Sequence, residues 1–429
     1  MPGMNTGLEG LRRKYDTAVF EKHVLENGIA VWLQKPPILT GYQGMVSAFL
    51  PRIGSRLDPP GSEGAAHFFE HLPFRGTMGR PSKLALISPL DALGGGANAQ
   101  TAPEFTRHFA WAPFEGFEVA VETVFEMAAR AVVTEEHVAL ERGAIEQEYR
   151  DRHTSGNGLL TMYLFQKYFG AHALGHLPIG TPDSIRAMTK DTLVDFRRRY
   201  YHPRNLHIVC GGSFATADAL LRVERIFGMM GDELEPWQPI ETARAPLSHS
   251  GLGTATDPSL GCDSLFLAYP LERIGLYGTR WSSLEFLADV LSKGLTSPLF
   301  QELREKRSLV YRVNTYLIYY QDIVFFVLYT PTESRNFGEV REIFKSTLAQ
   351  LTPEFVVKRQ REWQIERRSL FQEPLEACHS LVGDVTVWGE PISHTVGEEV
   401  RDAITVDEVF GWRNYLLDTH PFTFEARAK

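Results

Sequence analysis

The two halves of this 429-residue chain present the same succession of segments, and this repetition limits the possible folds more than any single motif does. GMVSAFLPRI (44–53) in the first half corresponds to CDSLFLAYPL (262–271) in the second. The helical pattern of ERGAIEQEYRDRH (141–153) likewise returns in PEFVVKRQREWQIERRSLFQ (353–372). We therefore expect an α+β fold of two homologous domains, each a mostly antiparallel sheet covered by helices.

The boundary between the halves is predicted from composition. Residues 231–251, GDELEPWQPIETARAPLSHSG, are acidic, contain proline and show no sustained periodicity, as is typical of a linker. The predicted division is a first domain over 1–230, a linker over 231–251 and a second domain over 252–429.

Local signals place several elements. HVLENGIAVWLQ (23–34) alternates as strands do around an Asn-Gly pair, which is typical of a hairpin turn. TEEHVALERGAIEQEYRDRH (134–153) has Thr134 as a candidate N-cap with acidic residues in the first turn, which predicts a helix start.

Charge and composition exclude several partners. The formal net charge of −9 offers no basic footprint for nucleic acid and disfavours an anionic membrane surface. No apolar run is long enough to span a bilayer, and the N-terminal MPGMNTGLEGLRRKYD lacks the apolar core of a secretory signal. The three cysteines lie far apart and form no CxxC pair. We expect a cytoplasmic protein.

HFFEH (67–71) is the segment with the clearest chemistry. On a helix, His67, Glu70 and His71 project from one face because positions i, i+3 and i+4 share it. A catalytic zinc site needs three protein ligands and an open position, so a third ligand would have to come from elsewhere in the chain. The alternative is a buried helix whose polar side chains are satisfied by ordinary hydrogen bonds.

The wider context favours the metal site. HxxEH is the inverted form of the HExxH signature of zinc peptidases, and GSEGAAHFFEHLPFRGT (61–77) resembles the signature of the pitrilysin or insulinase family of zinc metallopeptidases. In that family the third ligand is a glutamate about seventy-five residues downstream, in a helix reading ERxxIxxE. Here ERGAIEQE ends at Glu148, 148 − 71 = 77 residues after His71.

The resemblance implies roles for these side chains. His67, His71 and Glu148 would hold one Zn²⁺ per chain, and Glu70 would be the general base. Glu141, two turns before Glu148, would orient a ligand histidine.

Two more segments extend the resemblance over nearly the whole chain. GGGANAQTAPEFTRHFAW (94–111) is similar to the family's substrate-binding edge strand, with Asn98 and Ala99 in the matching positions. LREKRSLVY (303–311) is similar to the family's Arg and Tyr pair, here Arg304 and Tyr311, which bind a substrate carbonyl and donate to the developing oxyanion.

The resemblance implies half of a clamshell that encloses an unfolded peptide or a small precursor. A second chain would supply the other half, as a homodimer or as a heterodimer with a related subunit. Two alternatives stay open: a maturation protease dedicated to one precursor, and a non-catalytic peptide-binding subunit.

Two other candidate sites are set aside. His172 and His176 have helical spacing, but the nearby Gly175, Pro178 and Gly180 predict a loop. No oxyanion-hole motif accompanies Cys378, and we expect a buried thiol there.

Overall fold

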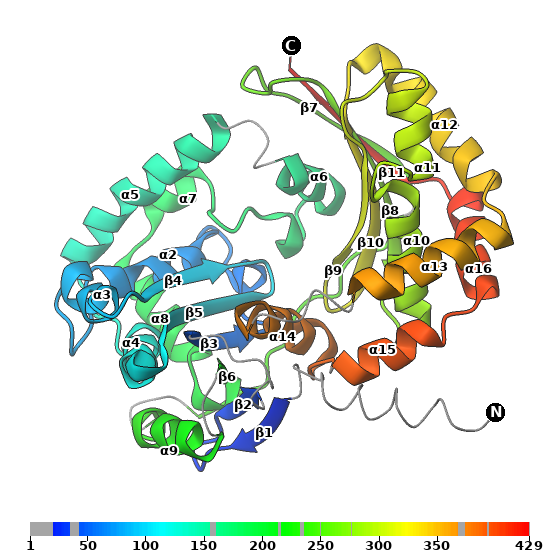
Figure 1. Cartoon of the computed structure of the whole chain (residues 1–429). Coiled ribbons are helices and arrows are strands. Elements are labelled where there is room, and N and C mark those ends of the chain that lie inside the picture. The colour runs from blue at the N-terminus through cyan, green and yellow to red at the C-terminus, as the bar shows by residue number, and fades with distance from the viewer. Residues whose placement is uncertain are drawn as a thin grey trace, which may run out of the picture. The chain divides into compact units, whose positions relative to one another are not determined.

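The computed structural model describes residues 20–34, 43–154, 160–212, 216–231, 236–248, 250–275, 277–367, 374–392 and 394–428. The N-terminal stretch considered as a signal segment lies outside these residues. The chain divides into two compact units, and each is built on its own sheet (Figure 1). The first unit comprises Met1–Tyr149, His176–Thr242 and Leu370–Val396, and the second comprises Arg150–Gly175, Ala243–Ser369 and Gly397–Lys429.

The sheet of the first unit has six strands. In spatial order they are β1 (Phe20–Val24), β2 (Ala30–Gln34), β6 (His207–Gly211), β3 (Gln43–Pro51), β5 (Phe105–Pro113) and β4 (Gly96–Thr101). Only β2 and β6 pair in parallel. The predicted hairpin is confirmed: β1 pairs with β2 around Asn27 and Gly28, and Gly28 takes the positive φ of 93° that such a turn requires.

Helices cover this sheet. They are α2 (Ala65–His71), α3 (Lys83–Asp91), α4 (Phe117–Ala129), α5 (Glu135–Thr154, whose last residues belong to the second unit), α7 (Pro182–Ala187), α8 (Lys190–Tyr200), α9 (Thr216–Phe227) and α14 (Pro374–Trp388). On β3, Met45 and Phe49 pack against α14, whereas Val46 and Ala48, which point to the opposite face, are equally buried. The sheet is therefore covered on both sides.

The second unit repeats this topology. Its strands, in spatial order, are β7 (Gly251–Thr256), β11 (Phe422–Arg427), β8 (Ser264–Glu272), β10 (Ile323–Pro331) and β9 (Asn314–Tyr319). The single parallel pair is β7 with β11, the counterpart of β2 with β6. The order β7-β11-β8-β10-β9 thus matches β2-β6-β3-β5-β4 strand for strand, which confirms the two homologous domains predicted from the sequence repetition.

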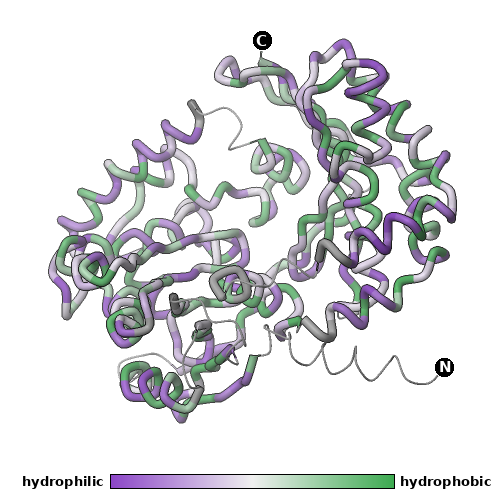
Figure 2. The backbone as a smooth tube through the Cα atoms, viewed as in Figure 1, coloured by the Kyte–Doolittle hydropathy of each residue, from purple (hydrophilic) through white to green (hydrophobic). Residues whose placement is uncertain are grey.

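Apolar residues dominate the central strands of the second sheet (Figure 2). β8 and β10 are buried along eight consecutive residues each, as expected for strands covered on both faces. The helices of this unit are α6 (Leu160–Phe169), α10 (Thr279–Ser292), α11 (Pro298–Phe300), the π-helical turn η6 (Gln301–Glu305), α12 (Phe337–Ala349), α13 (Pro353–Arg367), α15 (His394–Asp402, which begins in the first unit) and α16 (Val406–Asp418).

The two compact units are not divided by a single boundary at residues 231–251, because two segments lie in the other unit from the one expected. α6 belongs to the second unit because its aromatic side chains, Phe165, Tyr168 and Phe169, pack against Phe325 of β10. α14 belongs to the first unit because it covers β3 and β6. Within the expected linker, residues 236–248 contain no helix or strand, whereas residues 232–235 and 249 lie outside the described residues.

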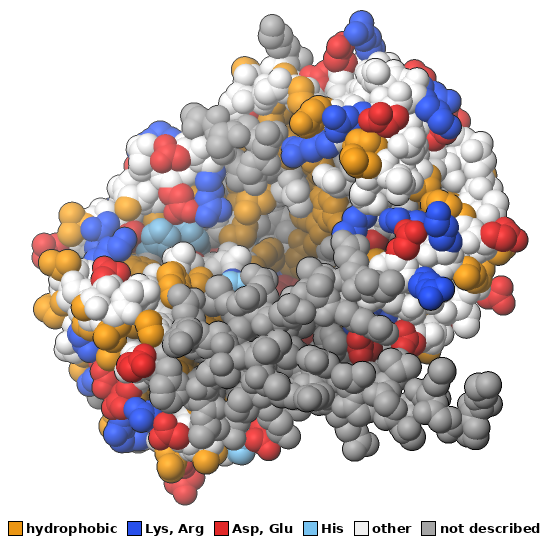
Figure 3. Space-filling model, viewed as in Figure 1, with side chains coloured by type: hydrophobic (Ala, Val, Ile, Leu, Met, Phe, Trp, Pro, Cys, Tyr) orange, Lys and Arg blue, Asp and Glu red, His pale blue; other side chains and the backbone are white. Residues whose placement is uncertain are grey.

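Charged side chains of both signs are mixed on the face shown in Figure 3. Among the described residues in Figure 3, Lys and Arg are interspersed with Asp and Glu, and no extended basic patch is present. In the part of the chain that the structure describes, no helix is both long and apolar enough to cross a membrane.

Candidate metal centre

The helix α2 carries the HFFEH segment and is set up by the loop that precedes it. Gly64 precedes the first turn with a φ of 95°, a conformation that side chains rarely adopt. The carboxylate of Asp58 accepts hydrogen bonds from the backbone N–H of Gly64 (2.6 Å) and of Ala66 (2.8 Å). Asp58 thereby satisfies donors that the start of a helix leaves unpaired.

Sequence reasoning missed Asp58. A capping side chain normally stands directly before its helix, whereas Asp58 acts across a folded loop from a position six residues before Gly64. Burial raises the pKa of Asp58 well above its ordinary value, although the two backbone hydrogen bonds oppose this shift.

On α2, the predicted polar face is observed. The rings of His67 and His71 lie with centroids 4.5 Å apart. His67 and Glu70 are each only 5% exposed, and His71 is partly buried. His67 and Glu70 therefore lie in the protein interior, and His71 lies at its boundary with solvent.

Helix α5 brings Glu148 to the two histidines. Its start is capped as predicted, since Thr134 Oγ1 accepts a hydrogen bond from the backbone N–H of His137 (3.0 Å). Thirteen residues into this helix, Glu148 Oε2 lies 3.7 Å from His67 Nε2 and 3.5 Å from His71 Nε2. The structure thus brings together three side chains from two helices distant in sequence.

Glu141, one of the predicted residues, bridges the same two helices. Its Oε1 lies 2.7 Å from His71 Nδ1, and its Oε2 accepts from Arg75 Nε. Burial alone would raise the pKa of Glu141, but the hydrogen bonds from His71 and Arg75 lower it. An ionised Glu141 holds the proton of His71 on Nδ1 and leaves the Nε2 lone pair directed toward Glu148.

The same neighbours also shift the pKa of His71. Burial disfavours its charged form, but the hydrogen bond to Glu141 and the charges of Glu70, Glu141 and Glu148 raise its pKa. An electronegative environment of this kind suits the binding of a cation.

These residues fit zinc. One ligand atom from each of His67, His71 and Glu148 can be chosen so that all three lie within 4.8 Å of one another, and within the described residues no other set of three such side chains meets this condition. Two imidazole nitrogens and one carboxylate oxygen form one of the donor sets found in catalytic zinc sites, which keep a further position open.

The predicted substrate strand lies at the edge of the same sheet. Among the described strands β4 pairs only with β5, so within this part of the chain its other side is available for strand addition. Asn98 and Ala99 lie mid-strand opposite Phe109 and His108. The Asn98 side chain is exposed and accepts a hydrogen bond from the backbone N–H of Ala99 (2.9 Å). α2 packs against β4 and β5, so the edge strand and the metal-binding helix are neighbours.

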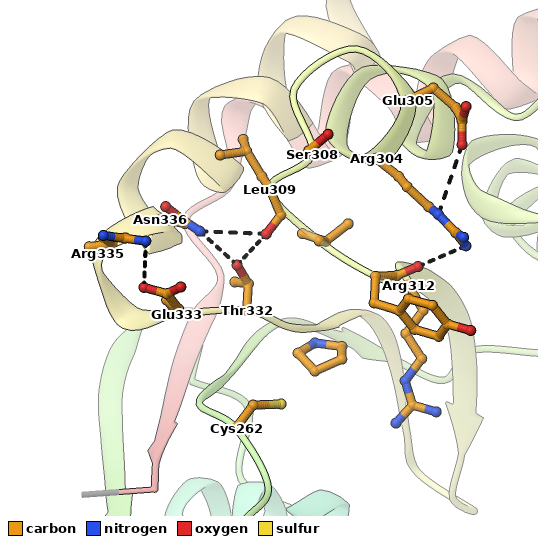
Figure 4. A pocket seen from close by; sticks show the side chains of 13 residues that line it. Cys262, Arg304, Glu305, Ser308, Leu309, Arg312, Thr332, Glu333, Arg335 and Asn336 are labelled. Atoms are coloured by element: carbon orange, nitrogen blue, oxygen red, sulfur yellow. Dashed lines mark hydrogen bonds and ion pairs between the residues drawn. The ribbon is translucent and has the colours of Figure 1, made fainter.

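The second unit contains the predicted Arg and Tyr pair. Arg304 lies in η6 and donates a hydrogen bond to the carbonyl oxygen of Tyr311 (3.0 Å), with its guanidinium 4.7 Å from the centroid of the tyrosine ring. Tyr311 is 76% exposed. Both residues line a pocket of about 1010 Å³ together with Cys262 and Arg312 (Figure 4). Within its own unit, the pair is therefore accessible to a ligand.

The two segments that were set aside have the local structure expected for them, a loop around His172 and His176 and a buried thiol at Cys378. His172 and His176 flank a 3₁₀ turn, Ala173–Gly175, and His172 Nε2 contacts the carbonyl oxygen of Ala243 (3.2 Å). Cys378 is fully buried on α14, and burial raises the pKa of its thiol to about 12.

Comparisons with known proteins agree with this geometry. A sequence model described as Insulinase (Peptidase family M16) matches residues 49–181, and one described as Peptidase M16 inactive domain matches residues 187–356. A protein of Streptomyces coelicolor described as an uncharacterized zinc protease is 32% identical over 306 residues, which span 69% of this chain and 64% of that protein. A Rickettsia bellii protein with the same description is 26% identical over 73% of both chains.

Solved structures match over almost the whole chain. A protease from Helicobacter pylori superposes with a TM-score of 0.86 at 20% identity, over 96% of this chain and 100% of that one. The periplasmic protease PqqL from Escherichia coli superposes with a TM-score of 0.78 at 16% identity, over 96% of this chain but 48% of its own. At these identities the structures establish the fold alone.

Proposed function

Because the chain belongs to the insulinase family of peptidases, family M16, we propose that it is a zinc-dependent endopeptidase that hydrolyses unfolded peptides or small precursor peptides. The observation that carries the proposal is the convergence of His67 and His71 from α2 with Glu148 from α5. The matched family model over residues 49–181 includes all three side chains.

Each residue of the site has a defined task. His67, His71 and Glu148 would hold one zinc ion, which when bound supplies Lewis-acid activation of water near neutral pH. Glu70 projects from the same face of α2 and would accept the proton of the attacking water, then return it to the leaving amine. Its burial keeps this proton transfer away from bulk solvent.

The edge strand would bind the substrate. A peptide added alongside β4 makes main-chain hydrogen bonds that do not depend on its sequence, so Asn98 and Ala99 would hold extended, unfolded segments. A folded protein cannot offer such a strand without local unfolding.

Assembly with a second chain is part of the proposal. This chain matches 48% of PqqL and 45% of pitrilysin, so it corresponds in fold to about half of each. We propose that another chain, identical or related, completes the enclosure and that Arg304 and Tyr311 then bind the substrate carbonyl and its developing oxyanion. The cytoplasmic location stays a prediction.

A non-catalytic peptide-binding subunit is the second candidate. The family model described as an inactive domain favours it, but that model matches residues 187–356, which contain none of His67, Glu70, His71 and Glu148. A maturation protease dedicated to one precursor uses the same residues and differs only in its range of substrates.

Cleavage of a mixed pool of unstructured peptides tests the proposal. The purified chain is assayed with and without a zinc chelator, beside Glu70→Gln. We expect cleavage that the chelator abolishes and that Glu70→Gln reduces by a factor of about 10³ or more while zinc remains bound. Wild-type rates in Glu70→Gln would contradict the mechanism, whereas zinc binding without any cleavage of the pool would favour a dedicated substrate or a missing subunit.

A further inference from the structure

The loop that joins β3 to α2, residues 52–64, is fastened to the turn between β4 and β5. The backbone N–H groups of Ser55 and Arg56 donate to the carbonyl oxygens of Ala102 (3.2 Å) and Pro103 (2.9 Å). We call residues 52–64 the connector loop. It therefore touches the end of the edge strand before it reaches the metal-binding helix.

Glycine is required at one point of this contact. A Cβ atom on Gly54 would lie 2.1 Å from the carbonyl oxygen of Ala102, a distance at which atoms overlap. The backbones of the connector loop and the β4–β5 turn approach each other closely only because this side chain is missing.

A buried ion pair closes the same contact. Arg56 Nη1 donates to Glu104 Oε1, and the two side chains are 2% and 4% exposed. A buried pair of this kind often stabilises a fold no better than apolar residues of the same volume, because both charges are removed from water. Its particular contribution is one fixed geometry between the segments that carry the charges.

Asp58, two residues after Arg56, connects the loop to the start of α2. The backbone N–H of Asp58 donates to the carbonyl oxygen of Ser55 (3.2 Å), which places Asp58 in the same hydrogen-bonded turn. The Asp58 carboxylate then accepts from the backbone N–H groups of Gly64 and Ala66 at the start of the helix. A continuous series of buried contacts thus runs from the end of β4 to the first turn of α2.

We propose that Arg56, Glu104 and Asp58 are positioning residues that fix the zinc-binding helix relative to the substrate-binding edge strand. This inference rests on the proposed function for its catalytic consequence, but not for the mechanical link itself. The three side chains lie outside the ligand set and the substrate strand.

The expected defect is specific. His67 and His71 share one helix, and Glu141 ties α5, which carries Glu148, to His71 and Arg75. A small displacement that moves α2 and α5 together therefore leaves the spacing of the three ligands intact. β4 still offers its edge to a peptide. What changes is the alignment of the peptide carbonyl with Glu70, and a misplacement of about 1 Å can cost a factor of about 10² in rate. Turnover should therefore fall while zinc binding and KM change little.

The experiment compares Arg56→Met, Glu104→Gln and the double variant Arg56→Met/Glu104→Met in the full chain. Each single variant removes one member of the ion pair and leaves the other charge buried, so it loses stability as well as position. The double variant replaces the pair by apolar side chains and regains stability, but it cannot restore the fork geometry of the arginine. The double variant therefore separates the effect of the pair on stability from its effect on the position of α2.

Three quantities are measured well below the unfolding temperature. Amide hydrogen exchange at Gly64 and Ala66 should accelerate about tenfold or more in all three variants, because the turn that holds Asp58 is loosened. On a fluorogenic unstructured peptide, kcat should fall about tenfold or more with KM within about threefold of the wild type. Bound zinc should stay at the wild-type level.

A matched control is Arg341→Met in the second unit, which breaks the ion pair with Glu425 and should lower stability without changing kcat or the exchange of Gly64. Wild-type kcat in the double variant, unchanged exchange at Gly64 and Ala66, or loss of zinc in proportion to activity would each overturn the proposal. If the wild type cleaves nothing, the exchange measurement still decides whether the link exists, so failure of the proposed function is distinguishable.

Discussion

His71 and Glu141 join the two helices of the candidate metal centre: Nδ1 of the histidine on α2 lies 2.7 Å from Oε1 of the glutamate on α5. Because Glu141 also accepts from Arg75, its charge is held in place on both oxygens. These hydrogen bonds orient the imidazole, and a ligand that is held in place loses less entropy when it binds a metal.

Replacing Glu141 tests this orientation. Glu141→Gln should weaken zinc binding about 10- to 100-fold, since a partner that orients a ligand histidine typically contributes this much. The zinc dissociation constant is measured by competition with a chromogenic chelator. Glu135→Gln, an exposed carboxylate in the first turn of the same helix, is the control and should bind zinc like the wild type.

Removing a ligand should have a larger effect. His71→Ala and Glu148→Ala each take away one of three donors, so we expect purified protein with little bound zinc and no cleavage, in contrast to the zinc-loaded, inactive Glu70→Gln. Metal content by atomic absorption checks this. Stoichiometric zinc in Glu148→Ala would remove Glu148 from the ligand set.

The three cysteines should differ sharply in reactivity. Cys262 is exposed, whereas Cys210 and Cys378 are buried, and burial raises the pKa of both buried thiols. Because the thiolate is the reactive form, a disulfide reagent should modify one thiol quickly in the native protein and all three after unfolding. Cys262→Ser should abolish the fast phase; a remaining fast thiol would contradict the buried placement of the other two.

His108 should make stability depend on pH. It lies on β5 with its ring 6.4 Å from that of Tyr201, and complete burial lowers its pKa from 6.5 to about 3. Between these values the unfolded chain binds a proton that the folded protein does not, so stability falls as the pH falls. The slope contributed is about 1.4 kcal/mol per pH unit.

Urea unfolding at pH 6.0 and 5.0 measures this slope. His108→Gln cannot titrate and should reduce the loss of stability between the two pH values by about 1 kcal/mol relative to the wild type. An unchanged slope would mean that the histidine is protonated in the folded protein. The absolute stability of the variant does not affect the comparison.

Local sequence patterns were sufficient for the elements that bear the site. Asn27 and Gly28 predict the first hairpin, and HFFEH predicts the polar face of α2, because turn conformation and helical periodicity are properties of neighbouring residues. The repeated succession of segments predicts two sheets of equal topology. Resemblance to the family, rather than spacing, singled out Glu148 and Glu141 among the many acidic residues of the chain.

Contacts between distant segments depended on tertiary packing. No periodic pattern in the sequence predicts the capping of α2 by Asp58 or the ion pair of Arg56 with Glu104. The same is true of the hydrogen bond from Arg75 to Glu141. Tertiary packing also explains why α6 lies in the second unit and α14 in the first, each outside the domain expected for it. The repeated elements and the types of ligand side chain could therefore be predicted from residues close together in the chain. Which side chains meet depends on tertiary packing, because such contacts require whole faces of helices and sheets to be buried against one another.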